Sequence, residues 1–236
     1  MLSSLSLPHD ISLSDRIRIY AQDRDELLER LFERYPQLRG LYPSALVENV
    51  ITDVCHYFIS ERPLPKGQVA LCSVGSRHVV YFNSRLADFV DSEKVNLEAL
   101  RCTAMAHELG HVRSHQDEME EGEFISYQED GRFRDARSYQ KEDEADLYSS
   151  VFLVPLELLE KAGPFREMLE ARANERPVGS GMLWAKVYKL AAAFGVTPTL
   201  MCRSLEVYGW IVKEPRKRKG LHDLRLVGAK PQRPRR

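Results

Sequence analysis

The sequence predicts an α+β fold that is mostly helical and contains one small antiparallel sheet. Three observations lead to this prediction. Several long segments repeat their apolar residues with the period of a helix. Two short segments, 68–72 and 78–83, are rich in β-branched and aromatic residues and flank Gly75-Ser76, as in a hairpin. The chain has 236 residues, enough for one large domain or two small ones.

Residues 1–60 are expected to supply N-terminal helices that pack on the core. Ser14 is a candidate N-cap for a helix over 15–34, whose apolar residues follow a helical period. Prolines and a glycine interrupt the chain after this helix. A second helix is expected over 44–59, with Phe58 among its inward-facing residues.

A third long helix is expected over 96–115, where Asn96 is a plausible N-cap. The stretch 116–141 is strongly acidic in its first part and contains two glycines, so it predicts a long loop or lid. A helix is expected to resume near 138 and to end before Pro155, because the residue preceding a proline is pushed out of the helical region.

The C-terminal part is expected to form a helical module over 163–212, followed by a tail. Helices are predicted at 157–161, 165–173, 183–194 and 199–208. Gly195 lies between the last two, which together resemble a helix-turn-helix. The tail, 213–236, holds ten Lys or Arg against two acidic residues, or +8, although the whole chain carries −1. Its charge and prolines predict a basic, disordered segment.

Composition excludes several classes of protein. No apolar run approaches the roughly 18 residues of a membrane span, and Met1–Pro8 lacks the features of a secretory signal. The four cysteines are scattered, which favours reduced thiols over a four-cysteine zinc site. We therefore expect a cytoplasmic protein with no membrane partner.

The main chemical signal is His107-Glu108-Leu109-Gly110-His111. On a helix, residues four apart differ by about 40° around the axis and about 6 Å along it, so both imidazoles can bind one metal ion. Glu108 lies beside that face and can serve as a general base. A catalytic zinc needs a third protein ligand, which this helix must obtain from elsewhere.

Two regions offer a third ligand. His115 stands eight residues from His107, about 12 Å along a helix, which is too far for both to bind one ion. The segment 142–146 offers Glu142, with Glu144 as an alternative. Glu142 and Asp146 are four apart and share a helical face, so one carboxylate can bind the metal while the other accepts the spare N–H of a ligand histidine.

Taken together, these residues resemble the ImmA/IrrE family of zinc metallopeptidases. The resemblance is carried by Ala106–His111, by Glu142-x-x-Ala145-Asp146 and by Leu153-Val154-Pro155. It implies a zincin-like, gluzincin-type catalytic core over 61–162. It further implies that His107, His111 and Glu142 bind one Zn²⁺ (or another divalent ion such as Mn²⁺), that Glu108 is the catalytic base and that Asp146 supports a ligand histidine. Tyr148-Ser149 and Phe152 depart from the usual family pattern.

The resemblance also implies a function: a zinc endopeptidase that cleaves a helix-turn-helix transcriptional repressor. Two alternatives stay open: a DNA-binding regulator with a structural zinc site, or an inactive zincin scaffold. The C-terminal module and basic tail are also expected to offer weak DNA contacts, beside the protein substrate. Strand 78–83 is expected to line the cleft and pair with an extended peptide. Candidate contacts to the substrate or the oxyanion are His115, Tyr127, Tyr139 and Arg137.

Overall fold

The computed structural model describes residues 5, 7, 10–65, 67–73, 78–89, 96–115, 136–214 and 222–228. It confirms the predicted α+β class, mostly helical with small sheets. The chain divides into two compact units, Met1–Leu153 and Val154–Arg236. None of the described helices combines the length and the apolar character that a bilayer crossing requires.

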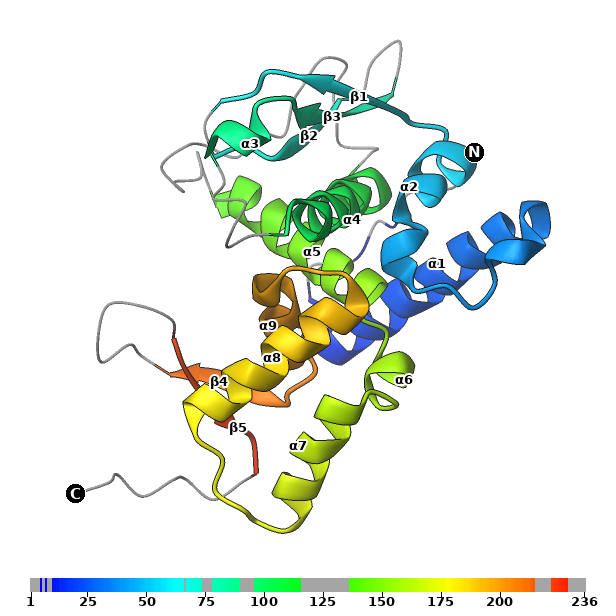
Figure 1. Cartoon of the computed structure of the whole chain (residues 1–236). Coiled ribbons are helices and arrows are strands. Elements are labelled where there is room, and N and C mark those ends of the chain that lie inside the picture. Colours follow the sequence, from blue (N-terminus) through cyan, green and yellow to red (C-terminus); the bar gives the residue numbers. More distant parts are fainter. Residues whose placement is uncertain are drawn as a thin grey trace. The chain divides into compact units, whose positions relative to one another are not determined.

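The first unit is built from a small sheet and long helices (Figure 1). Its helices are α1 (Leu13–Arg34), α2 (Val47–Asn49), α3 (Leu86–Phe89), α4 (Leu97–His115) and α5 (Ala136–Leu153), with short 3-10 turns at Pro36–Leu38 and Pro43–Ala45 and a π-helical turn at Val50–Val54. Its strands are β1 (Phe58–Arg62), β2 (Ala70–Ser73) and β3 (Val79–Asn83). Helix α5 packs alongside α4, while β2 covers α4 and α1 packs against α5.

The sheet has the order β1-β3-β2. Strands β2 and β3 pair antiparallel, with Leu71 opposite Tyr81, which confirms the predicted strand pair. Strand β1 pairs parallel with β3 and was not predicted. The central position of β3 leaves β2 at an edge of the sheet. Asn83 fixes the approach to β2, because its side chain donates to the Gln68 carbonyl at 2.8 Å and accepts from the Leu64 amide at 3.1 Å.

The predicted helix over 44–59 is wrong in its second half. Helical turns end at Val54, and His56 then adopts φ 61°, which turns the chain into β1. Phe58, expected to face inward, is 64% exposed at the start of the strand. Helical periodicity continues through Phe58 in the sequence, but pairing with β3 supplies the backbone hydrogen bonds in the folded chain.

The ends of the long helices follow from local chemistry. Ser12, rather than Ser14, caps α1, since its hydroxyl accepts from the Asp15 amide at 3.1 Å. Asn96 caps α4 as predicted by accepting from two amides of the first turn, at 3.0 and 3.1 Å. Helix α5 ends at Leu153, ahead of Pro155, as expected.

The second unit contains helices and a two-stranded sheet. Its elements are α6 (Leu156–Leu159), α7 (Gly163–Ala173), α8 (Ser180–Phe194), α9 (Pro198–Val207), β4 (Ile211–Glu214) and β5 (Asp223–Leu226). Gly195, with φ 65°, closes α8, and the Thr197 hydroxyl caps α9 by accepting from the Leu200 amide. Two helices joined by a short turn thus occur where the sequence resembled a helix-turn-helix.

The prediction of a disordered tail is wrong where β4 and β5 pair antiparallel. Leu224 and Leu226 are buried and alternate with exposed Arg225, which is the pattern of a strand with one buried face. The prediction of disorder rested on the net charge of the whole tail and overlooked this alternation. The amide of Leu224 donates to the Ser180 hydroxyl at 2.9 Å, which ties β5 to α8. The tail outside β4 and 222–228 lies beyond the described residues.

A buried ion cluster joins three helices of the first unit. The Arg113 guanidinium on α4 donates to both carboxylate oxygens of Asp23 on α1, with a shortest distance of 2.6 Å. The Tyr148 hydroxyl on α5 donates to the same carboxylate at 2.6 Å. All three residues are at most 5% exposed. Burial lowers the pKa of Arg113, but the hydrogen bonds to Asp23 outweigh it and the pKa is raised. The sequence analysis had found no role for Asp23.

We predict that Asp23→Asn destabilises the protein by roughly 3 kcal/mol, because the Arg113 charge then loses its carboxylate in a buried setting. Urea unfolding followed by circular dichroism measures the change. Asp88→Asn is the matched control, since the Arg85–Asp88 pair is exposed, and it should not shift the unfolding midpoint. Equal midpoints for the two variants would contradict the role of the cluster.

Candidate metal centre

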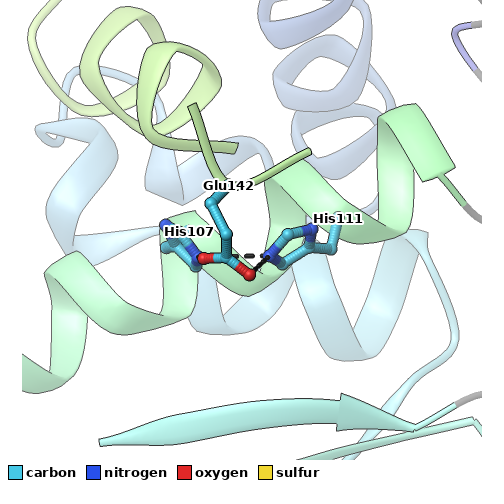
Figure 2. A group of neighbouring side chains, drawn as sticks. All are labelled: His107, His111 and Glu142. Atoms are coloured by element: carbon cyan, nitrogen blue, oxygen red, sulfur yellow. Dashed lines mark hydrogen bonds and ion pairs between the residues drawn. The ribbon is translucent and has the colours of Figure 1, made fainter. Parts of the chain in front are cut away.

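Helix α4 presents two imidazoles toward α5. His107 and His111 lie one turn apart, and their rings point at Glu142 on α5 (Figure 2). The His111 ring is buried, and the His107 side chain is 20% exposed. The i, i+4 spacing that the sequence predicted therefore places both rings on the face of α4 that meets α5.

A close approach of the two helices brings Glu142 within reach. Gly110 faces Ala145, and a Cβ added at Gly110 would lie 2.9 Å from the Ala145 Cα and 3.0 Å from its carbonyl oxygen. It would also lie 3.2 Å from the Tyr148 Cβ. Since real Cβ atoms do not approach backbone this closely, only glycine allows this separation of α4 and α5. The sequence analysis did not predict this requirement for glycine at position 110.

The donor atoms of the three predicted ligands converge. The Nε2 atoms of His107 and His111 are 3.1 Å apart. Carboxylate oxygens of Glu142 lie 3.1 Å from the His107 Nε2 and 3.5 Å from the His111 Nε2. A tetrahedral zinc ion with bonds of about 2.0–2.1 Å places neighbouring ligand atoms about 3.3 Å apart. Among the described residues, these three side chains form the group suited to hold a metal ion, and their spacing is that of three corners of a tetrahedron around such an ion.

The electrostatics of the cluster favour a cation at this point. Burial disfavours a charged His107, yet hydrogen bonds to Asp146 and Glu142 outweigh it and raise its pKa to about 10. Burial works against the ionised Glu142, but the hydrogen bonds from both histidines lower its pKa to about 2. Burial lowers the pKa of His111 to about 4. The carboxylates of Glu142 and Asp146 thus favour a positive charge beside the His107 ring.

Glu108 has the environment of a general base. Its carboxyl is 6% exposed, and its Oε2 atom has no hydrogen-bond partner within the described part of the chain. Burial raises the pKa of Glu108 to about 7, against the opposing effect of the His107 charge. The backbone amide of Cys72 on β2 donates to the carboxylate. An orphaned buried oxygen with a pKa near neutrality suits a group that takes up and releases a proton.

A cleft of about 270 Å³ opens over these groups. Its walls come from three places: α4, α5 and the segment leading into β2. The lining residues are Gly67, Gln68, Val69, Ala70, Leu100, Thr103, Ala104, His107, Glu108, His111, Glu142, Asp146 and Ser149. Sequence reasoning missed the contribution of 67–70 because it assigned the cleft wall to strand 78–83. That strand is β3, which pairs on both sides within the sheet.

Two further acidic residues of α5, Asp146 and Glu144, contact different histidines of α4. Asp146 accepts from the Nδ1 of His107 at 2.9 Å, as the sequence analysis expected of a supporting carboxylate. Glu144, the alternative ligand, instead contacts the Nε2 of His115 at 3.0 Å. His115 is 2% exposed and lies behind His111, outside the cleft lining. The structure therefore does not support His115 as a substrate or oxyanion contact.

The remaining candidate contacts are not brought to the cleft. Tyr139 is 59% exposed on the first part of α5 and does not line the cavity. Tyr127 and the side chain of Arg137 lie outside the part of the chain that the structure describes. No oxyanion donor is assigned among them.

We predict that Gly110→Ala weakens zinc binding on the order of tenfold or more, because the new methyl group must push α5, and with it Glu142, away from α4. Competition with a chromophoric chelator measures the affinity. Gly181→Ala on α8 is the control: nothing lies within 4 Å of its added Cβ, so zinc affinity should stay at the wild-type value. Wild-type affinity in Gly110→Ala would show that close packing is not needed.

Comparison with known proteins agrees with this geometry. Residues 96–206 match the family model described as the IrrE N-terminal-like domain, Peptidase_M78. The match begins at the N-cap of α4, includes all of the predicted ligands and runs to the end region of α9. No curated protein matches the chain. Residues 96–206 are therefore similar to the IrrE N-terminal-like domain of Peptidase_M78, in agreement with the family that the sequence motifs had indicated.

Proposed function

We propose that this protein is a zinc-dependent endopeptidase. One observation carries the proposal: three ligand atoms spaced for a tetrahedral ion lie beside a buried carboxylate of raised pKa, and all of them face one cleft. The match to a peptidase family supports the same reaction class. A purely structural zinc site would use a fourth protein ligand, whereas the group formed by the described residues has three.

His107, His111 and Glu142 would hold the ion. When bound, zinc supplies a Lewis acid that polarises a peptide carbonyl and lowers the pKa of water toward about 7. Glu108 accepts the proton of the attacking water and then delivers it to the leaving amine. The Cys72 amide orients one oxygen of Glu108, which leaves Oε2 available for that proton.

An extended substrate fits the outer edge of β2. Val69 accepts from the Asn83 amide at 2.9 Å, so its carbonyl faces β3. Because backbone groups alternate along a strand, those of Ala70 and Cys72 face away from β3. The Cys72 amide does reach Glu108 on that side, and Ala70 lines the cleft. A peptide added at this edge would run past the metal ligands by β-addition. This replaces strand 78–83 as the proposed docking strand.

For the substrate we propose a helix-turn-helix transcriptional repressor, with cleavage in the cytoplasm where such a repressor acts. The proposal rests on the family resemblance and the family match. The acidic stretch that could attract a basic DNA-binding protein lies outside the described residues, so charge complementarity adds no support here.

The DNA-binding alternative has less support. In a helix-turn-helix the second helix must present its side chains to the groove. Helix α9 instead buries Leu200, Met201 and Leu205. Arg203 is the one basic residue of this helix, and it is half-buried. The inactive-scaffold alternative is separated from the peptidase by the experiment below.

We predict that Glu108→Gln still binds one zinc ion per chain but cleaves about 100- to 10,000-fold more slowly, because it keeps the ligands and loses the base. The assay combines metal analysis with cleavage of purified helix-turn-helix repressors. Chelation should abolish wild-type cleavage, and added zinc should restore it.

Glu98→Gln is the matched control, an exposed glutamate on the same helix, and it should cleave like the wild type. Full activity in Glu108→Gln would rule out the mechanism. Zinc binding by the wild type without cleavage of any tested repressor would favour the scaffold.

A further inference from the structure

His115 connects a metal-ligand histidine to a carboxylate. Its Nδ1 lies 3.1 Å from the Nδ1 of His111, and its Nε2 lies 3.0 Å from a carboxylate oxygen of Glu144. Both ring nitrogens are therefore engaged. The His111 and His115 side chains are each only 2% exposed, so the contact between them is shielded from water.

The direction of the hydrogen bonds follows from the ligand geometry. His111 directs Nε2 at His107 and Glu142, so a metal there leaves its proton on Nδ1. That N–H must donate to the Nδ1 of His115, which in turn keeps its own proton on Nε2 and donates to Glu144. One chain of donors thus sets the tautomers of both rings.

Glu144 is itself held in place. The Gln140 amide donates to its second oxygen at 3.0 Å, and the Arg16 guanidinium of α1 lies 3.8 Å from the same oxygen. The glutamate side chain is 16% exposed, compared with 57% for Asp146, which supports His107 directly. The two proposed ligand histidines are therefore supported differently. His107 contacts the exposed carboxylate of Asp146 directly, whereas His111 reaches the more buried carboxylate of Glu144 through the imidazole of His115.

We propose that His115 is a positioning residue that links Glu144 to His111, fixing the His111 ring with Nε2 directed at the metal. This inference rests on the proposed zinc site and adds a role that the ligand set alone does not contain. It also explains why α4 carries a third histidine on the stripe of His107 and His111: the position one turn beyond His111 lies too far for the ion but within reach of the His111 Nδ1.

The test uses the full chain loaded with zinc. His115→Leu removes the acceptor for His111, and Glu144→Gln removes the charge at the end of the chain of hydrogen bonds. Both should weaken zinc binding by about 10- to 100-fold, as loss of such supports does in other metal sites. His115→Gln keeps one acceptor and one donor, and should bind zinc more tightly than His115→Leu. Chelator competition gives the affinities, and circular dichroism checks that each variant is folded.

A spectroscopic measurement distinguishes positioning from general structural support. Long-range ¹H–¹⁵N spectra of the histidine rings should show His115 protonated on Nε2 and His111 on Nδ1 in the zinc-bound wild type. Asp143→Asn is the control for loss of charge, because Asp143 is exposed on the same turn of α5, and it should leave zinc affinity unchanged.

Three outcomes would overturn the inference. Wild-type zinc affinity in both His115→Leu and Glu144→Gln would remove the role of His115 while leaving the metal site intact. A His115 ring protonated on Nδ1 in the zinc-bound protein would do the same. A wild-type chain that binds no zinc would overturn the metal site itself, and the inference with it.

Discussion

The contact between Gly110 on α4 and Ala145 on α5 is the constraint on which the candidate site depends. The two backbones approach so closely that a single added methyl group would meet the Ala145 Cα at 2.9 Å. Two histidines four residues apart lie on the same face of a helix whatever the rest of the fold. A third ligand from another helix reaches the same metal ion only if the two helix axes lie at the right distance. The missing side chain at Gly110 sets that distance, and Glu142 reaches both imidazoles as a result.

Buried charge is arranged around this contact in pairs. Three acidic residues of α5 contact histidines of α4. Glu142 contacts both proposed ligand histidines, Asp146 contacts His107, and Glu144 contacts His115. Further along α4, Arg113 is neutralised by Asp23 with help from Tyr148. A buried charge is costly unless it is paired, so these pairings determine how α1, α4 and α5 can pack. The N-terminal helix is thereby part of the structure that supports the site.

The sheet contributes through its edge. Because β3 pairs with β1 on one side and β2 on the other, β2 is an edge strand among the described strands, and its outward backbone groups face away from β3. One of them, the Cys72 amide, holds the proposed base, and the neighbouring Ala70 borders the cleft. The strand that orients Glu108 is therefore the same strand that would orient a peptide. Substrate position and base position are linked through one rigid element, which favours a reproducible attack geometry.

Local patterns in the sequence were enough for the parts of the site that lie on single helices. The spacing of His107 and His111, and that of Glu142 and Asp146, places each pair on one helical face whatever the rest of the chain does. The caps and ends of α4 and α5 were predictable for the same reason, since Asn96 and Pro155 act on their immediate neighbours.

What the sequence left undecided depends on contacts between distant segments. The strand beginning at Phe58 has the apolar spacing of a helix, and only parallel pairing with β3 makes it β1. The partner of His115, and the choice between Glu142 and Glu144 on geometric grounds, follow from how α5 lies against α4. The amide that orients Glu108 is a backbone group, which no residue type can reveal. The sequence by itself determined which side chains could bind a metal; the tertiary structure decided which of them meet, because distances between elements are set by packing.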